Sequence, residues 1–211
     1  MSNICEMWND NDCAAWEREL VRYWSFVKPS NLALEKEVDK LDANSVNLMG
    51  PEEWYRFLLE KYFRWKYTAP NRYASTTMHL KKHSANNELR MLHGIKARIF
   101  ADAERDAVQK SLESASSIRG LGTAGASGLL AILFPSQFGT VDQFLVKALA
   151  EVPELPEARL TAGMKPESLT ISDGVMLIGI MRRKAQELNK ACSTTAWTPR
   201  KVDMVLWTCG H

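Results

Sequence analysis

With 211 residues, of which 45% are hydrophobic and 25% charged, the chain has the composition of one globular domain or of two small lobes. Its formal net charge of +2 and pI of about 8.3 are only mildly basic, so a DNA-binding face would need local clusters of basic residues. Candidate clusters are Lys81-Lys82-His83, Lys96 with Arg98, and Arg182-Arg183-Lys184. Taken alone, each of them is better explained as a solvated helix face.

No apolar run follows a basic start and no apolar stretch reaches 18 residues, so we expect neither secretion nor membrane insertion. We therefore expect a cytoplasmic protein, associated with the nucleoid if the source is bacterial. The four cysteines lie far apart in two pairs, a distribution that favours reduced thiols over a disulfide framework. They are Cys5, Cys13, Cys192 and Cys209.

Apolar residues recur at helical spacing along most of the chain. The first predicted helix is one that Asn11 or Asp12 can cap and that ends at Lys28-Pro29. A shorter helix follows, and the polar stretch 44–50 is predicted to be a loop. Strand-like alternation is nearly absent, which indicates an all-α protein.

The third predicted helix begins at Pro51 and ends before Pro70, because the residue that precedes a proline disfavours helix. Later helices are predicted at 71–82, 87–100, 104–115, 123–134, 142–152 and 172–188, and after Thr198-Pro199. A proline-rich loop covers the residues between 152 and 172. We predict an all-α fold of two lobes with a cleft between them: one lobe spans 51–152, with the hairpin 118–134 and Asp142, and the other combines 1–50 with 153–211.

The segment Ile118 to Leu149 carries the most informative pattern, a Gly-x-Gly turn formed by Gly120 and Gly122 and followed by small residues. Glycines allow a tight turn and a close crossing of two helices. If a helix starts near Thr123, the amides of this turn lie at the positive end of a helix dipole, which suits one DNA phosphate. A lone acidic residue, Asp142, follows Gly120 by 22 positions.

This segment resembles the helix-hairpin-helix (HhH-GPD) DNA glycosylase superfamily, which includes endonuclease III and the mismatch adenine, alkyladenine and 8-oxoguanine glycosylases. In that family an L-P-G-x-G-x-x-x-A hairpin is followed, at this spacing, by V-D-x-x-(hydrophobic)-x-(K/R), whose aspartate is catalytic. The matching residues are Gly120, Gly122, Ala126, the apolar helix 129–134, Val141-Asp142 and Val146-Lys147. The chain departs from the pattern at Arg119, where the family has proline, and at Ala124.

Ala124 aligns with the lysine that bifunctional members use as an amine nucleophile. Without that amine the resemblance implies a monofunctional enzyme, which hydrolyses the N-glycosidic bond of a flipped base and leaves an abasic site. It assigns catalysis to Asp142. The residues it assigns to the DNA backbone are Arg119, Gly120, Gly122, Thr123, Ala124 and Lys147.

The resemblance also implies partners and cofactors. We expect a monomer that binds double-stranded DNA and passes its product to an abasic-site endonuclease. The family's four-cysteine iron–sulfur loop is not expected, because only Cys192 and Cys209 lie in the C-terminal region. The family pattern leaves room for a structural monovalent cation at the hairpin. The four histidines lack paired metal-ligand spacing, so we expect no metal enzyme.

Aromatic and basic residues alternate in a second region, from Phe63 to Tyr73. Such side chains could stack on an extruded base, fill the gap left in the duplex or contact phosphate. The candidate pocket or wedge residues are Trp65, Lys66, Tyr67, Asn71 and Arg72. In the alternative interpretation, Trp65 and Tyr67 are core residues and Lys66 is solvated.

Three functional questions stay open at the level of sequence. A non-catalytic DNA-binding or repair-scaffold protein could keep the hairpin and lack the pocket. A lyase could use a different amine, at Lys66 or Lys147. The substrate could be an alkylated, oxidised or deaminated base, or a hypermodified phage cytosine removed as antiphage defence.

Overall fold

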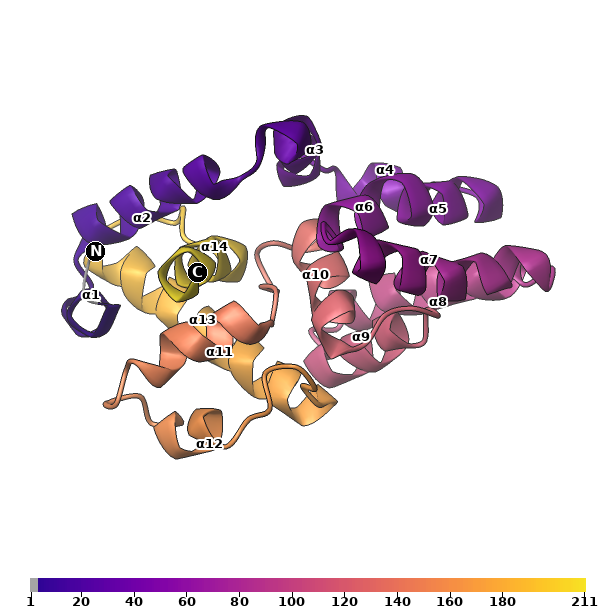
Figure 1. The fold of residues 1–211 in the computed structure, drawn as a ribbon. Helices are drawn as coiled ribbons and strands as arrows, with labels where there is room; N and C mark the ends of the chain where they lie inside the picture. Colours follow the sequence, from indigo (N-terminus) through magenta and orange to yellow (C-terminus); the bar gives the residue numbers. More distant parts are fainter. Residues whose placement is uncertain (1–3) are drawn as a thin grey trace. The chain divides into compact units, whose positions relative to one another are not determined.

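The structure is a computed structural model that describes residues 4–211 (Figure 1). Helices make up 73% of it, and no strand occurs among the described residues, so the all-α class is confirmed. Within this part of the chain, no helix has both the length and the apolar character that a membrane crossing requires.

The chain divides into two compact units. Unit 1 is discontinuous and combines Met1–Lys28 with Pro135–His211, whereas unit 2 is the continuous segment Pro29–Phe134. Both junctions fall at a proline, a residue that restricts the backbone before it and interrupts helices. These boundaries differ from the expected lobes: the hairpin belongs to unit 2, and Asp142 belongs to unit 1.

In unit 1 the last helix of the chain is the central element, because it lies against both α2 and α11 (Figure 1). The helices of this unit are α1 (Ile4–Asp10), α2 (Cys13–Phe26), α11 (Gln143–Ala150), α12 (Ala158–Ala162), α13 (Ile171–Ala191) and α14 (Pro199–Gly210). Side chains cap four of them, α2 by Asp12, α11 by Asp142, α13 by Thr170 and α14 by Thr198. The caps predicted at Asp12 and Thr198 are therefore confirmed.

In unit 2 the apolar helix that follows the glycine turn is almost entirely buried and packs against α9. Its elements are α3 (Pro29–Asp39), α4 (Ala43–Asn47), α5 (Pro51–Phe57), the π-helical turn η1 (Leu58–Tyr62), α6 (Phe63–Lys66), α7 (Pro70–Ala85), α8 (Leu89–Glu104), α9 (Val108–Ser116) and α10 (Thr123–Leu133). The predicted third helix is confirmed as a continuous run from α5 through α6. The loop prediction for 44–50 is wrong in part, because Asp42 caps the short helix α4.

Each candidate basic cluster contains one buried side chain, so the interpretation as a solvated helix face is wrong for one residue in each. His83, Lys96 and Lys184 are almost fully buried. The Lys96 ammonium donates to the carbonyls of Val46, Asn47 and Met49 at 3.3, 2.6 and 2.5 Å, and thereby satisfies the C-terminal carbonyls of α4. Burial lowers the pKa of Lys96 and of Lys184. These two lysines act as structural donors.

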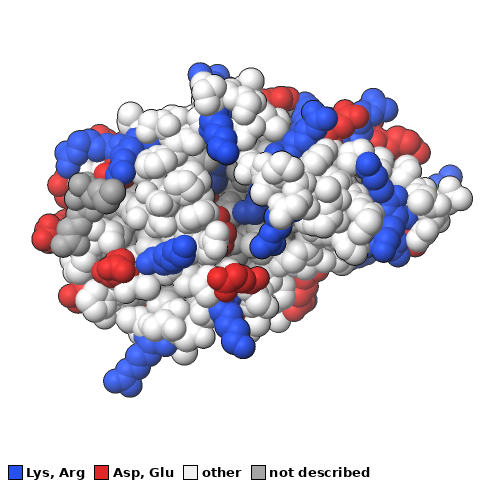
Figure 2. All heavy atoms as spheres, in the orientation of Figure 1, with Lys and Arg blue, Asp and Glu red and all other residues white. Residues whose placement is uncertain are grey.

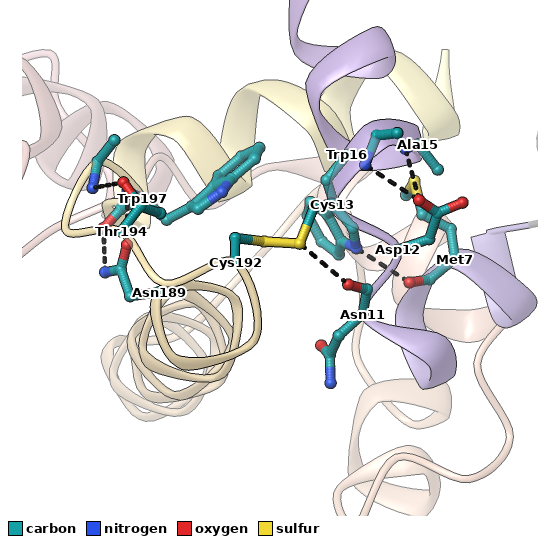
Figure 3. Close-up of a disulfide and its surroundings, with 12 residues drawn as sticks. Met7, Asn11, Asp12, Cys13, Ala15, Trp16, Asn189, Cys192, Thr194 and Trp197 are labelled. Atoms are coloured by element: carbon teal, nitrogen blue, oxygen red, sulfur yellow. Dashed lines mark hydrogen bonds between the residues drawn. A yellow bond between two sulfur atoms is a disulfide. The ribbon is translucent and has the colours of Figure 1, made fainter.

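A disulfide joins Cys13 at the start of α2 to Cys192 at the end of α13, with Cα atoms 5.8 Å apart (Figure 3). The expectation of four reduced thiols is thus wrong for this pair, since cysteines distant in sequence meet when unit 1 folds. Cys209 is a free thiol, and the Cys5 thiol donates to Glu154 Oε2 at 3.3 Å. The disulfide removes one support for a cytoplasmic location, because such bonds are rare in cytosolic proteins.

We expect loss of this cross-link to destabilise unit 1, because it joins the N-terminal segment to the rest of the unit. Cys13→Ser/Cys192→Ser should lower the free energy of unfolding by about 2–4 kcal/mol. Urea denaturation followed by far-UV circular dichroism measures the change. All proteins are measured without reductant, and the control variant is Cys209→Ser, which removes a thiol outside the disulfide. Equal stabilities of the double variant and the wild type would contradict the prediction.

Candidate DNA-binding hairpin and acidic site

The turn between α9 and α10 has a conformation that only glycine adopts without strain at one position. Gly120 has φ of +95°, and a Cβ there would lie 2.5 Å from the carbonyl oxygen of Thr76. Ile118 and Leu121 on either side are buried and anchor the turn, and the Leu121 amide donates to the Ile118 carbonyl at 3.0 Å. Gly120 therefore allows the turn to lie directly against α7.

Gly122 is the N-cap of α10 and has no side chain with which to cap the helix. It is exposed, Thr123 and Ala124 after it are half-buried, and a Cβ at Gly122 would meet nothing within 4 Å. The first-turn amides of a helix need acceptors from outside the helix and carry partial positive charge. The start of α10 thus has the chemistry of an anion site.

Arg119 is held by residues of α7 and of the turn before α8. Its guanidinium pairs with the Glu88 carboxylate at 3.0 Å, and its backbone amide donates to His83 Nε2 at 3.1 Å. His83 Nε2 must be unprotonated to accept this bond, and burial lowers the His83 pKa in agreement with that requirement. The geometry gives Arg119 a role in fixing the turn, and its contact with DNA stays a prediction.

Side chains from the aromatic region pack beneath the hairpin. The Tyr67 hydroxyl donates to the Gly120 carbonyl at 3.2 Å, and the Tyr62 hydroxyl donates to the Gly125 carbonyl. Burial raises the pKa of Tyr67 to about 12, so this phenol stays protonated and keeps donating. Lys66 lies against Gly128 of α10, because a Cβ added to Gly128 would be 3.2 Å from the Cδ of Lys66.

Of the other candidate pocket residues, Trp65 is held by α3, and Arg72 is near enough to Tyr67 to act on it electrostatically. The Trp65 indole donates to Glu35 Oε2 on α3 at 2.7 Å, an arrangement typical of a structural tryptophan. Asn71 and Arg72 are exposed in the first turn of α7. The structure therefore brings Lys66 and Tyr67 to the hairpin.

Asp142 caps α11 with one carboxylate oxygen. Its Oδ1 accepts from the amides of Phe144 and Leu145 at 3.0 and 3.2 Å, and the side chain is only half-buried. Among residues 4–211, Oδ2 has no hydrogen-bond donor and can accept one from a ligand or from water. Lys147, one turn further along α11, is exposed, with its ammonium 5.5 Å from the centroid of the Phe144 ring.

A buried carboxylate fixes the backbone just before Asp142. Asp203 Oδ2 accepts from the Thr140 amide at 2.6 Å, and Asp203 Oδ1 pairs with Arg200 at 2.8 Å. Burial raises the pKa of Asp203 to about 6, although Arg200 and the Thr140 amide act in the opposite direction. Sequence reasoning missed Asp203, and the only available signal was an acidic residue three positions after Arg200 and next to the apolar run of α14.

Charge is distributed rather than concentrated on the visible face of the molecule. Figure 2 shows Lys and Arg side chains interspersed with Asp and Glu and separated by uncharged residues. No group of three or more metal-binding side chains occurs among the described residues. At the hairpin, hydrogen bonds within the chain already engage the carbonyls of Ile118 and Gly120.

Comparisons with protein-family models, with curated proteins and with solved structures found no match to this chain. The candidate residues form two groups, the hairpin with Arg119, Gly120, Gly122, Thr123 and Ala124 in unit 2, and Asp142 with Lys147 in unit 1.

We expect the hairpin to lose stability as the pH falls, because protonated His83 cannot accept from the Arg119 amide. The His83 pKa is lowered on folding, so its contribution is complete above the unfolded-state value of about 6.5 and is lost below it. His83→Gln keeps an acceptor and should show a smaller decrease in the free energy of unfolding between pH 7 and pH 5. Urea denaturation at both values measures this, with His79→Gln as an exposed control. An unchanged pH dependence in His83→Gln would rule the mechanism out.

Proposed function

We propose that the chain is a monofunctional DNA N-glycosylase that removes a damaged or modified base from double-stranded DNA. The observation that carries the proposal is the pairing of two features: an exposed helix start without a cap side chain at Gly122, and a half-buried carboxylate, Asp142, with one oxygen uncommitted. The motif spacing between them matches that of the helix-hairpin-helix glycosylases. Ala124, which carries no amine, stands where the strand-cutting members have lysine.

The hairpin binds the DNA backbone through the amides of Thr123 and Ala124, which donate to a phosphate at the start of α10. Such contacts position the strand and carry no sequence information. Lys147 adds an exposed positive charge to the same helix as the acid. The choice of base therefore depends on residues other than Thr123, Ala124 and Lys147.

Asp142 acts on the extruded nucleotide in its ionised form. Its carboxylate stabilises the positive charge that develops on the deoxyribose as the bond to the base breaks, and it accepts a proton from the attacking water. The water oxygen becomes the hydroxyl at the sugar carbon, and the departing base takes a proton from solvent on the nitrogen that carried the bond. Asp142 then returns the proton of the attacking water to solvent, so the step consumes one water overall. The products are an abasic site and a free base, which suit an abasic-site endonuclease as the next enzyme.

A side chain at residue 122 tests the anion site without disturbing the fold. Gly122 has extended backbone angles and open space around it, so Gly122→Asp can cap α10 as other helices of this chain are capped. We expect unchanged or higher stability, by about 0.5–1 kcal/mol, together with weaker DNA binding, because the carboxylate occupies the amides and repels phosphate.

Fluorescence anisotropy with a labelled duplex, at two salt concentrations, measures the affinity. Gly122→Asn is the matched control, since it offers a similar cap without the charge and should impair binding less. Equal affinities of the wild type and Gly122→Asp would remove the hairpin from the binding surface.

Asp142→Asn should abolish base release and leave both folding and DNA affinity close to those of the wild type, because asparagine caps helices about as well as aspartate. We expect a loss of at least about 100-fold, typical of removing a group that stabilises transition-state charge. Chromatography of bases released from duplexes that carry alkylated, oxidised, deaminated or hypermodified bases measures the activity. Asp12→Asn is the control, since Asp12 caps α2 of the same unit through equivalent bonds.

The products decide between the remaining alternatives. Strand cleavage should appear only after alkali or an abasic endonuclease is added. A covalent adduct trapped by borohydride would instead assign lyase chemistry to an amine such as Lys66 or Lys147. DNA binding without base release from any of these duplexes would favour the non-catalytic scaffold.

A further inference from the structure

Three aromatic rings of unit 1 surround the imidazole of His211. The His211 ring lies 4.4 Å from the Trp207 ring, nearly parallel to it, and 4.7 and 5.5 Å from the Phe144 and Phe26 rings. We call Phe26, Phe144 and Trp207 the aromatic cage. They come from α2, α11 and α14, so the fold assembles them from three distant parts of the sequence.

The cage is held in place by its own ring contacts. The Trp207 ring meets the rings of Tyr23, Phe26 and Phe144 edge-on, with centroids 5.5, 6.0 and 5.7 Å away. Gly210 lies against the carbonyl of Phe144, and the lack of a Cβ there lets the end of α14 approach α11. The rings are therefore fixed by packing that does not depend on His211.

The aromatic cage is open to solvent on the side where His211 lies. All three cage rings are half-buried, whereas His211 is exposed. The imidazole is a planar heterocycle held by ring contacts, which are individually weak. Another planar heterocycle can replace it without leaving a buried polar group unpaired.

The surroundings of the cage indicate which heterocycle fits. The Phe144 amide donates to Asp142 Oδ1, so one wall of the cage is two residues from the proposed catalytic acid. The Lys147 ammonium lies 5.5 Å from the Phe144 ring centroid and is exposed. A planar ring attached to an anionic backbone, namely a nucleobase in a DNA strand, complements both the rings and this charge.

We propose that the aromatic cage binds the extruded nucleobase and that His211 occupies the same place in the free protein. The assignment of this base to the substrate rests on the proposed function, whereas the stacking itself does not require catalysis. His211 competes with the base, so it weakens binding of any strand that presents one.

The experiment compares two labelled single strands of equal length, oligo-dT and the same backbone with all bases replaced by tetrahydrofuran. Anisotropy should show roughly tenfold tighter binding of oligo-dT, a difference in the range reported for stacking one base on an aromatic side chain. His211→Ala should bind oligo-dT still more tightly and leave the affinity for the abasic strand unchanged. Trp207→Leu keeps apolar volume but removes the stacking face, so it should lose the preference.

Trp24→Leu is the matched control, because Trp24 is a half-buried tryptophan of the same unit that contacts Tyr23 and lies outside the cage. Thermal melting checks that each variant folds. In a second measurement, the NMR signals of the His211 ring protons should lose their ring-current shift when oligo-dT is added. His211→Ala identifies these signals, so this readout does not depend on the stability of Trp207→Leu.

Equal affinities for the two strands in both the wild type and His211→Ala would overturn the proposal, as would His211 signals that oligo-dT leaves unchanged. Failure of the proposed function is a separate result. If no duplex releases a base but the preference for oligo-dT depends on Trp207, the cage is supported and the glycosylase assignment is not.

Discussion

The first-turn amides of every helix need acceptors, and this requirement links the fold of the chain to its candidate site. Asp12, Thr170 and Thr198 meet it within unit 1 and serve stability alone. Asp142 meets it with Oδ1, which accepts from the amides of Phe144 and Leu145. At α10 the N-cap is Gly122, which supplies no side chain to the first-turn amides. The candidate residues thus lie at two helix starts, that of α10 in unit 2 and that of α11 in unit 1.

Unit 1 is built from two segments that are distant in the sequence, so specific interactions have to join them into one core. The Cys13–Cys192 disulfide does this covalently at one end of α2. Near the other end, Arg200 of α14 reaches the Tyr23 hydroxyl at 3.4 Å while it pairs with Asp203. Asp203 in turn holds the Thr140 amide. The N-terminal segment and the backbone before Asp142 thus share one buried network.

Local signals predicted much of this fold and some of the site. Proline and cap residues located the starts of α2, α5 and α14, and helical spacing of apolar residues gave the all-α class. The burial of Lys96 and Lys184 could not be predicted, because a lysine in a basic run looks solvated until its carbonyl acceptors are known. The disulfide and the aromatic cage were missed for the same reason: their members are adjacent only in three dimensions. Gly120 was identified from its motif, and the structure adds the close approach to Thr76 that makes a side chain unacceptable there.

The discontinuous arrangement also has a consequence for biosynthesis. All of unit 2 leaves the ribosome before the second part of unit 1 does, so we expect unit 2 to fold first. Helices α1 and α2 must then wait, with Trp16 and Tyr23 exposed, until α13 and α14 arrive to cover them. During this interval Cys13 is an accessible thiol without its partner, and the order of synthesis makes the N-terminal segment the part of the nascent chain most in need of protection by a chaperone.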